Sequence, residues 1–475
     1  MLVKPVIRSM KYHVIAPKDV YMSLKDQTSS KYSYLLESCE GDAKSAQYSF
    51  LGVHPIGRIS IHKNKVDIEG ETFSKIDKSQ TEPLSIIKSS LGDIEIQNSS
   101  KKPRFIGGVV GYFSYDLIRY YLPYLEEKNT DISMPDAEFI YTKDTIAFDH
   151  RSSELEIVCS AVGEDERDLK DDIGAAYNRV ADIEEIVLSS EKNELRLSES
   201  KKLDYVSDTS EEEYMNMVRR TKEYIREGDI FQTVISKRNS LDSKNSHETY
   251  LALKTLNPSP YLYFLEFGDN TILGSSPEML IRVEDRHVTT RPIAGTRKRG
   301  ATEKMDRYLA NEMISDPKEC AEHIMLVDLH RNDLGRVCEY ETVKTTELMG
   351  VERFSHVQHI VSTVEGDLHS KYTSFDALKS IFPAGTVSGA PKVRAMEIIN
   401  ELEHQRRGAY AGAVGYFGLD QNIDFAITIR TIIQNKKNAY VQAGAGIVSD
   451  SDPKKEWVES ENKAAAMMKA LSMVS

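Results

Sequence analysis

Two ten-residue segments far apart in this chain repeat one pattern. Residues 107–116 (GGVVGYFSYD) and 411–420 (AGAVGYFGLD) agree at six of ten positions. Glycine inside a strand marks a place where another backbone comes close, and a repeat of such a strand points to duplication. The 475 residues suffice for two or three domains or for one large duplicated one. The repeat therefore favours a duplicated body that mixes helices and strands.

The composition changes between residues 160 and 212, where charged helix formers replace aromatic residues. Short β-like runs precede this stretch, whereas stronger helical patterns and denser Gly and Pro follow it. We predict a connector here, between an N-terminal half (1–200) and a C-terminal half (201–475).

The chain is acidic, with 61 Lys and Arg against 74 Asp and Glu and a net charge of −13 at pH 7. This balance argues against nonspecific binding to nucleic acid or to an anionic membrane. Four scattered cysteines without a C-x-x-C pair argue against a disulfide framework and a zinc site. No apolar run approaches about 18 residues, and residues 1–17 lack an apolar signal core. We expect a cytoplasmic protein, and an acidic enzyme that acts on an acidic substrate needs a metal or a local cluster of arginines.

Two pairs of glutamates, Glu319 with Glu322 and Glu456 with Glu459, have the i, i+3 spacing that places both carboxylates on one helical face. Mg²⁺ seeks oxygen ligands, keeps several waters and bridges a few carboxylates to acidic groups of a substrate. The pairs predict a magnesium site for an anionic substrate. The alternative is a solvated face, which is our interpretation of the same spacing at Glu191.

Two loops of small residues flank a candidate anion-binding arginine. Residues 382–392 open onto a helix predicted from about Val393, where free backbone amides can hold an anion. Residues 443–446 (AGAG) follow a strand-like run and are predicted to form a second anion nest. Arg430 is predicted on one face of a mainly apolar strand, where its guanidinium requires a carboxylate. A substrate can supply that carboxylate, and so can one of the chain's many acids; both loops are also compatible with ordinary turns.

A family resemblance rests on several ordered motifs. Most follow residue 210: 257–261 (NPSPY), 275–278 (SSPE), 291–297 (RPIAGTR), 322–329 (EHIMLVDL), 357–362 (VQHIVS) through to Pro391-Lys392, and 452–459 (DPKKEWVE). Thinner matches in the first half are 35–38 (LLES) and 48–52 (YSFLG). On these motifs the chain resembles the chorismate-utilising enzymes, and within them the branch that aminates chorismate. The resemblance implies an α+β fold in which facing antiparallel β-sheets are flanked by helices, with the chorismate-binding catalytic region in residues 201–475.

The resemblance also implies roles for individual residues. Mg²⁺ would be held most directly by Glu322 and Glu459, with Glu319 and Glu456 close by, against the ring carboxylate of chorismate. Arg430 with Tyr410 would hold the enolpyruvyl carboxylate, although Tyr410 is also compatible with a core position at a strand start. The other residues implied to line the pocket are Gly295, Thr296, Thr386, Gly444, Ala445, Gly446 and Lys463.

The implied reaction is amination of chorismate at C2 by ammonia with loss of the 4-hydroxyl, followed by elimination of pyruvate to leave anthranilate. The resemblance assigns the proton transfers to Glu278 and His359, with Thr386 in the same catalytic set, and such groups typically contribute 10²–10⁴-fold. Which of the two serves which step stays open. By residue type alone, His359 in an apolar run is more often a buried core histidine, and only the resemblance favours the catalytic role.

Two positions distinguish the family's reactions. Where aminodeoxychorismate synthase uses a lysine that attacks C2, this chain has Ala294, which cannot do so. Where the isochorismate and salicylate synthases use a lysine base to activate water, the matching residue is Gln232. Ammonia is therefore the expected nucleophile. None of the four cysteines lies in a G-x-C-x-G elbow, so a separate glutamine amidotransferase subunit is the expected ammonia donor.

Two segments resemble the family's tryptophan regulatory site. Glu37 could pair with the ammonium of L-tryptophan and Ser38 could form a hydrogen bond, while prolines stiffen the opposite wall. The residues assigned to this site are Glu37, Ser38, Asn257, Pro258, Ser259 and Tyr261. L-Tryptophan is the expected inhibitor, although the same motifs can serve as packing alone. Aminodeoxychorismate synthase and a non-catalytic binder of tryptophan or chorismate are the alternatives to the main reading.

Overall fold

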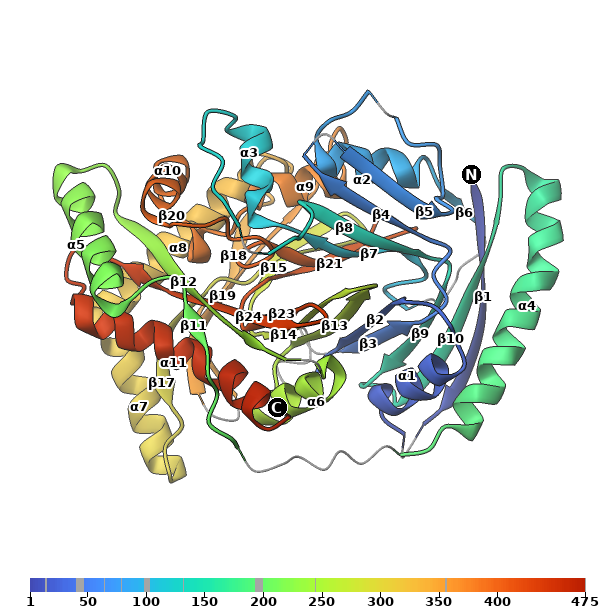
Figure 1. Cartoon of the computed structure of the whole chain (residues 1–475). Helices are drawn as coiled ribbons and strands as arrows, with labels where there is room; N and C mark the ends of the chain where they lie inside the picture. Colours follow the sequence, from blue (N-terminus) through green and yellow to red (C-terminus); the bar gives the residue numbers. More distant parts are fainter. Residues whose placement is uncertain are drawn as a thin grey trace.

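The computed structural model describes residues 1–12, 15–39, 47–63, 65–77, 79–97, 103–130, 132–192, 200–243, 245–354 and 357–474. Two large and mostly antiparallel sheets lie face to face at the centre, and helices cover their outer sides (Figure 1). The helices in the described residues are α1 (Pro17–Asp26), α2 (Pro83–Leu91), α3 (Ile118–Tyr121), α4 (Glu166–Ser189), α5 (Glu211–Glu227), α6 (Ser246–Leu256), α7 (Glu303–Ser315), α8 (Pro317–Gly335), α9 (Ser374–Ile381), α10 (Lys392–Leu402) and α11 (Pro453–Ser472). Single 3₁₀ turns occur at η1 (Tyr115–Leu117) and η2 (Gly385–Val387). The expected α+β fold with facing antiparallel sheets is confirmed.

The first sheet has 13 strands within the described ranges, and strand β20 pairs with β12 off its main path. Its order is β11 (Val206–Ser207), β12 (Gln232–Asp242), β24 (Asn438–Ile447), β23 (Thr431–Gln434), β14 (Asn270–Ser276), β13 (Tyr261–Phe267), β2 (Tyr32–Glu37), β3 (Tyr48–Gly52), β9 (Asp144–Asp149), β10 (Glu154–Gly163), β1 (Leu2–Lys11) and β6 (Glu95–Ile96), with β20 at Gly389–Ala390.

The second sheet has 11 strands in the same described part of the chain, and β18 pairs with β19 off its main path. Its order is β17 (Ile293–Lys298), β19 (Val357–Asp367), β16 (His287–Thr290), β15 (Met279–Glu284), β22 (Ile423–Ile427), β21 (Ala413–Gly418), β7 (Gly108–Phe113), β8 (Ala137–Thr142), β4 (Gly57–His62) and β5 (Lys65–Gly70), with β18 at Lys344–Arg353.

The two halves of the chain follow the same plan. In the first sheet β2-β3-β9-β10-β1 is matched by β13-β14-β23-β24-β12, and in the second β7-β8-β4-β5 is matched by β21-β22-β15-β16. The glycine-rich segments that repeat in the sequence form β7 and β21, which pair with Gly111 opposite Gly415. A Cβ on either glycine would lie 2.0 Å from a carbonyl oxygen of the neighbouring β8 or β22. This repeated plan supports the expected duplication.

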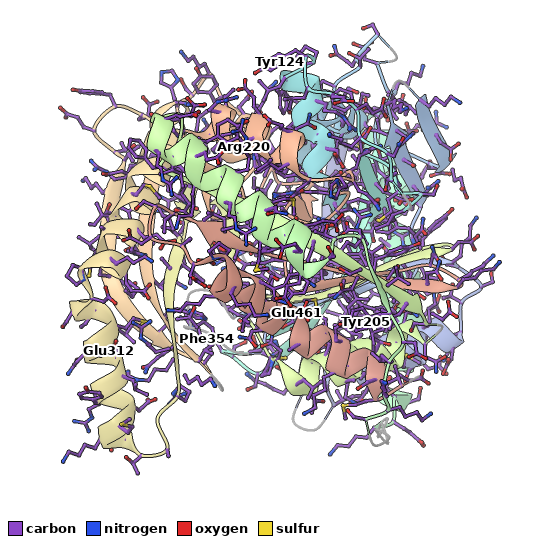
Figure 2. All side chains as sticks on the ribbon, turned by 60° about the vertical axis from the view of Figure 1, so that its left-hand side comes forward. Tyr124, Tyr205, Arg220, Glu312, Phe354 and Glu461 are labelled. Carbon is purple, nitrogen blue, oxygen red and sulfur yellow. The ribbon has the colours of Figure 1, made fainter. Side chains whose placement is uncertain are left out.

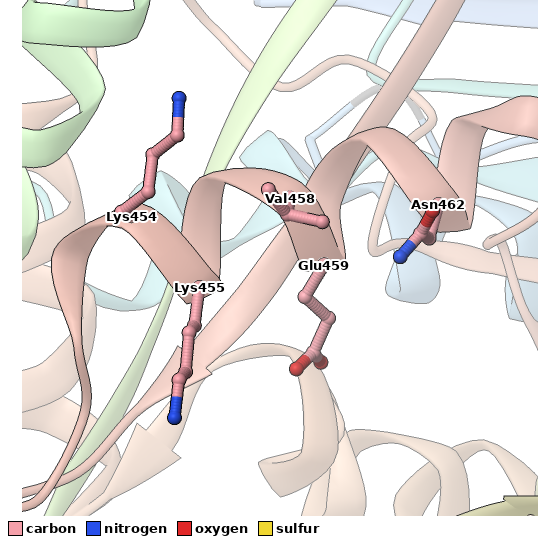
Figure 3. A pocket seen from close by; sticks show the side chains of 5 residues that line it. All are labelled: Lys454, Lys455, Val458, Glu459 and Asn462. Atoms are coloured by element: carbon pink, nitrogen blue, oxygen red, sulfur yellow. The ribbon is translucent and has the colours of Figure 1, made fainter.

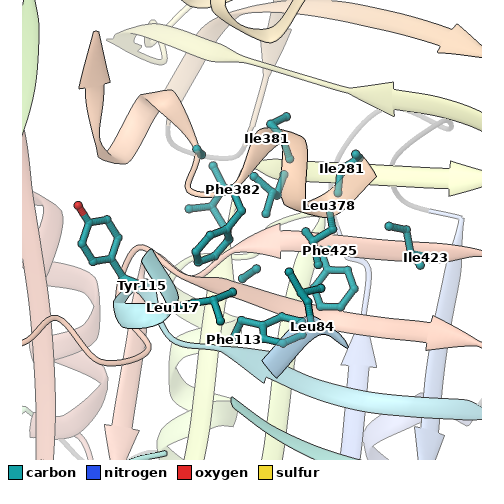
Figure 4. Packing of buried hydrophobic residues seen from close by; sticks show 14 of the residues in the cluster. Leu84, Phe113, Tyr115, Leu117, Ile281, Leu378, Ile381, Phe382, Ile423 and Phe425 are labelled. Carbon is teal, nitrogen blue, oxygen red and sulfur yellow. The ribbon is translucent and has the colours of Figure 1, made fainter. Parts of the chain in front are cut away.

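Three apolar clusters define the layers. One cluster fills the space between the sheets with residues such as Tyr112, Tyr263 and Tyr416. A second packs α1, α4, α6 and α11 on the outer side of the first sheet. The third joins the second sheet to its covering helices, and Figure 4 shows Phe113 and Phe425 facing Leu378, Ile381 and Phe382 in this layer. Alternation of side chains along each strand produces this division because successive residues point to opposite faces.

The segment predicted as a connector contains α4, which packs along β10 and β1, and residues 193–199 of it lie outside the described residues. The second half carries an insertion between β16 and β21, which includes β17, α7, α8, β18 and β19. Figure 2 shows α7, with Glu312, at one side of the molecule, and α11, with Glu461, across the front. None of the described helices is long and apolar enough to cross a membrane.

Candidate active site

The chain crosses from one sheet to the other at two neighbouring places, and each crossing carries a candidate residue. Glu278 lies between β14 and β15, and Arg430 lies between β22 and β23. Two backbone hydrogen bonds join the crossings, from Ser275 N to the Arg430 carbonyl (3.1 Å) and from Ile427 N to the Glu278 carbonyl (3.1 Å). The fold therefore brings the crossing that carries the carboxyl of Glu278 next to the crossing that carries the guanidinium of Arg430.

Glu278 is a buried carboxyl with a strongly perturbed pKa. Its side chain is 5% exposed, and its oxygen Oε1 is buried without a hydrogen-bond partner among the described residues. Burial raises its pKa to about 8, although the Thr386 hydroxyl, the Ile293 amide and the Lys463 ammonium each favour the ionised form. At neutral pH this carboxyl is mostly protonated, which suits a proton donor.

His359 lies on β19 opposite a bulge in β17. Gly295 forms the bulge with φ +61°, and its carbonyl accepts a hydrogen bond from Nδ1 of His359 at 2.9 Å. A carbonyl can only accept, so Nδ1 carries the proton and Nε2 keeps a free lone pair. Burial, together with Arg430 and Lys463, lowers the pKa of His359. The ring of Phe354, labelled in Figure 2, stands edge-on to the imidazole at 5.6 Å. His359 is thus neutral and suited to accept a proton.

Arg430 is not on a strand face, and that prediction is wrong. Its backbone has φ +53° because β22 ends at Ile427 and the chain must turn into the other sheet before β23. Its Nη1 donates to the Lys463 carbonyl at 2.7 Å, and within the described residues no acid is within ion-pair distance. Burial lowers the pKa of Arg430, while Tyr410 and Glu459 act in the opposite direction. A half-buried guanidinium without a protein carboxylate is a fitting receptor for a substrate carboxylate.

Tyr410 lies in the turn before β21 and is buried, beside the guanidinium of Arg407 at 5.6 Å from its ring centre. Arg407 is fully buried and pairs with Glu403, and it donates to the carbonyls of Val387 (2.8 Å) and Val234 (2.7 Å). It thereby joins Tyr410, the loop that carries Thr386, and β12. Our sequence analysis missed Arg407; the one local signal for it is Glu403, four residues earlier, with which it pairs.

The segment predicted as a second anion nest is part of a strand, so that prediction is wrong. Gly444, Ala445 and Gly446 lie inside β24 and pair with β12, since the chain stays extended to Ile447. A Cβ on Gly446 would be 2.7 Å from Nε2 of Gln232, so this glycine permits a close approach. Nζ of Lys463 donates to the Gly444 carbonyl at 3.1 Å, which brings this strand to the site.

The four candidate metal carboxylates lie near the starts of two helices, with Glu319 and Glu456 in the first turns and Glu322 and Glu459 one turn further on. Both helices start with Asp-Pro, and the aspartates Asp316 and Asp452 cap them by accepting from the Lys318 and Lys455 amides. Helix starts also favour nearby negative charge. Figure 3 shows Glu459 and Lys455 projecting from the same side of α11. Both side chains line a hollow of about 310 Å³.

The four glutamates differ in their side-chain surroundings. Glu322 accepts from Nε2 of Gln232 (3.2 Å), and Glu319 pairs with Arg297 (2.8 Å). Glu459 pairs with Lys463 (2.7 Å), whereas Oε2 of Glu456 is buried without a hydrogen-bond partner in the described part of the chain. Burial, with Glu319 and Glu459 nearby, raises the pKa of Glu322. The two pairs therefore share one electrostatic environment.

We tested whether these residues fit Mg²⁺. Among the described residues, no three His, Cys, Asp or Glu side chains are close enough to form a metal site by themselves. Mg²⁺ does not need such a cage, because it commonly binds one or two carboxylates and completes its shell with water and substrate oxygens. The unpartnered oxygen of Glu456 and the raised pKa of Glu322 indicate uncompensated negative charge. The donor set fits Mg²⁺.

The two segments of the expected regulatory site also meet. Glu37 and Ser38, at the end of β2, lie against β13, where Ser38 Oγ donates to the Pro260 carbonyl at 2.6 Å. Glu37 is buried and pairs with Lys254 at 2.7 Å. Glu37 and Ser38, together with Tyr261, line a cavity of about 40 Å³ between the sheets.

The remaining residues assigned to that site face backbone and hydroxyl groups. Asn257 Nδ2 donates to Ser275 Oγ at 3.1 Å, and Ser259 Oγ donates to the Ser276 carbonyl at 3.0 Å. Pro258 is half-buried between them, and none of these three residues lines the cavity.

Comparison with known proteins defines the family. Residues 31–469 match the family model described as chorismate binding enzyme. The chain belongs to this family of chorismate binding enzymes. Within the family it is 46% identical to anthranilate synthase component 1 of Acetivibrio thermocellus, over 93% of this chain and 90% of the relative. It is 42% identical to anthranilate synthase component 1 of Aquifex aeolicus, over 96% of this chain and 92% of the relative.

Solved structures agree with the fold. The crystal structure of anthranilate synthase component I from Streptococcus pneumoniae matches with a TM-score of 0.79 at 37% identity, over 96% of this chain and 98% of that one. The menaquinone-specific isochorismate synthase of Escherichia coli matches with a TM-score of 0.72 at 19% identity, over 99% of this chain and 95% of that one. This second likeness concerns the fold alone.

Proposed function

We propose that the chain is the aminating component of an anthranilate synthase and converts chorismate and ammonia to anthranilate and pyruvate. The observation that carries the proposal is a half-buried Arg430 with no acid within ion-pair distance among the described residues, hydrogen-bonded through its backbone to the crossing that carries the protonated Glu278, and close enough to the neutral His359 to lower the pKa of that histidine. The relatives named anthranilate synthase component 1 support the same reaction.

In the first step, the nitrogen of ammonia bonds to C2, the ring double bonds shift, and the C4–O bond breaks. Hydroxide is a poor leaving group, so a proton must reach the 4-oxygen as it departs and convert it to water. We assign this proton to Glu278, since its pKa of about 8 keeps the carboxyl protonated at neutral pH.

In the second step, the C2 proton is removed, the C3–O bond breaks, and the ring becomes aromatic as pyruvate leaves. We assign the removal of this proton to His359, whose Nε2 has a free lone pair and whose lowered pKa keeps it neutral. The carbonyl of Gly295, at the bulge in β17, orients the imidazole ring of His359. Thr296 and Thr386 complete the polar lining of the proposed substrate pocket.

Binding of the dianionic substrate uses a positive charge at each of its two ends. Arg430, with Tyr410 and Lys463, would hold the enolpyruvyl carboxylate, and the strand Gly444–Gly446 would form one wall. Mg²⁺ on Glu322 and Glu459, with Glu319 and Glu456 nearby, would neutralise the ring carboxylate. The acidic chain thereby accepts a dianion.

Ala294 and Gln232 favour ammonia attack at C2 over the competing reactions of the family. Ala294 lies on β17 opposite Ile360 and has no amine that could bond to C2. Gln232 cannot deprotonate water, so it does not support isochorismate formation. Aminodeoxychorismate synthesis and a non-catalytic binder are the alternatives that the experiment below also tests.

A separate glutamine amidotransferase is the proposed ammonia donor. Cys159 and Cys338 are buried, and burial raises the pKa of both thiols, that of Cys338 to about 11. Such thiols are inert as nucleophiles at neutral pH. Cys39 and Cys320 stand in sequences without the elbow of a glutaminase.

L-Tryptophan is the proposed inhibitor, bound where Glu37, Ser38 and Tyr261 line the small cavity. Because Glu37 is already paired with Lys254, the ligand's ammonium must share or displace that lysine. The cavity of about 40 Å³ must also widen. We further propose that residues 1–200 contribute to this site, that residues 201–475 form the catalytic region, and that the protein is cytoplasmic.

The purified chain should be incubated with chorismate, Mg²⁺ and ammonium, and the products should be separated by chromatography. Anthranilate and pyruvate in equal amounts are expected. Isochorismate or an aminodeoxychorismate that persists would contradict the proposed reaction, and unconsumed chorismate would favour a binding role. Turnover of glutamine by the chain alone would contradict the need for a partner.

A further inference from the structure

One stripe of α8 runs from the metal carboxylates to a buried ion pair. Glu322, Leu329 and Asp333 are spaced i, i+7 and i+11, so they share a helical face. Glu322 accepts from Gln232, and Asp333 pairs with Lys392 at 2.7 Å. Between them Leu329 meets Gly385, where a Cβ would be 2.1 Å from Cδ2 of Leu329. The middle of the stripe therefore contacts the loop that carries Thr386, and its end at Asp333 contacts Lys392, which follows that loop.

Lys392 follows the end of that loop and ties it to the neighbouring helices. It is the first residue of α10, and its Nζ also donates to the carbonyl of Ile381, the last residue of α9, at 2.8 Å. The side chains of Lys392 and Asp333 are 14% and 1% exposed. Oδ1 of Asp333 has no hydrogen-bond partner among the described residues, so the carboxylate depends on this lysine. One ammonium thus joins α8, α9 and α10.

We propose that Lys392 is a positioning residue, whose ion pair with Asp333 fixes α8 against the Thr386 loop and so sets Glu322 relative to Thr386 and Glu278. This inference rests on the proposed function of that site. The pair itself is distant from the reacting atoms, since the eleven residues from Glu322 to Asp333 correspond to about 16 Å of helix. It acts through the helix, and neither side chain contacts substrate.

The choice of an ion pair at this place supports a positional role. A buried pair contributes little net stability, because apolar side chains of similar volume often stabilise a core as well or better. What it adds is directional contact: the ammonium must meet Oδ2 of Asp333 and the Ile381 carbonyl at once. Rate is sensitive to such placement, because a displacement of about 1 Å can reduce it about a hundredfold.

The main test is the double variant Lys392→Met with Asp333→Asn, which removes both charges and keeps the volume. We expect kcat to fall about tenfold or more while the KM for chorismate changes less than about threefold. Backbone amides of residues 382–391 should exchange with deuterium faster than in the wild type. The matched control is Lys25→Met with Glu266→Gln, which removes a pair of the same 2.7 Å length away from the site. It should leave both kcat and this exchange unchanged.

A second variant, Asp333→Glu, keeps the proposal testable if the double variant does not fold. Asp333→Glu keeps the ion pair but lengthens one partner, so it should retain a wild-type melting temperature and still lower kcat. A wild-type kcat in either Asp333 variant, or an equal loss of kcat in the control, would overturn the proposal. If the wild type makes no anthranilate, the proposed function fails, and the exchange of residues 382–391 still decides whether Lys392 holds the loop.

Discussion

Replacing Glu278 by glutamine tests the assignment of the proton donor. The variant keeps the shape and the hydrogen-bonding capacity of a protonated carboxyl but cannot release a proton to the leaving hydroxyl. We expect kcat to fall by about 10²–10⁴. The matched control is Glu138→Gln, which alters another buried carboxyl whose pKa is raised, to about 7, in the second sheet away from the site. The control should change stability but not kcat.

The raised pKa of Glu278 also predicts how the stability of the protein depends on pH. Raising a carboxyl from 4.5 to about 8 by burial corresponds to about 5 kcal/mol. The folded state holds this proton more tightly than the unfolded state, so the resulting stability is present below pH 4.5. It is lost as pH rises from there through about 8. Glu278→Gln does not titrate, so its free energy of unfolding relative to wild type should rise between pH 5 and pH 9, by up to about 5 kcal/mol.

Activity should follow the same titration. In the wild type, kcat should fall as pH rises through about 8, because the acid form of Glu278 is lost. The assay is steady-state formation of anthranilate from pH 6 to 10, with the concentration of unprotonated ammonia held constant. Urea unfolding at pH 5 and pH 9 supplies the stability measurement. An alkaline limb that persists in Glu278→Gln, or a wild-type kcat in that variant, would refute the assignment.

Three further outcomes are expected. Arg430→Gln should lower kcat/KM for chorismate by about 10–100-fold, through loss of a charge-assisted contact worth about 1.5–3 kcal/mol, and an unchanged KM and kcat would exclude Arg430 as the carboxylate receptor. Glu459→Gln should raise the Mg²⁺ concentration for half-maximal rate at least about tenfold, as titration of an EDTA-treated enzyme will measure; an unchanged requirement would remove Glu459 from the metal site. Ser38→Ala should weaken inhibition by L-tryptophan, within the usual coupling of about 1–3 kcal/mol, and a wild type that is insensitive to millimolar tryptophan would count against the regulatory site.

Local patterns predicted much of the fold because they reflect the packing directly. The repeated glycines at 111 and 415 marked a close strand contact, and the structure pairs them. The i, i+3 spacing predicted that each glutamate pair shares a helical face, and the structure places both pairs on helices, near the starts of α8 and α11. The family resemblance supplied the remaining candidate residues, and the fold places two of them, Glu278 and Arg430, at the neighbouring crossings between the sheets.

The failures occurred where tertiary context overrides a local pattern. Arg430 follows an apolar run that reads as one continuous strand, yet the chain leaves one sheet and enters the other there. The AGAG segment reads as a turn, but its glycines instead let β24 approach β12. The roles of Arg407 and Lys392 were missed because partners such as the Val234 carbonyl and the Asp333 carboxylate lie far from them in the sequence.

The central claim is best tested by following fluorescence of anthranilate after chorismate is added to the purified chain with Mg²⁺ and ammonium near pH 8. The account predicts a rise in fluorescence that stops on addition of EDTA and resumes when Mg²⁺ is restored in excess. Consumption of chorismate without the fluorescent product would contradict it.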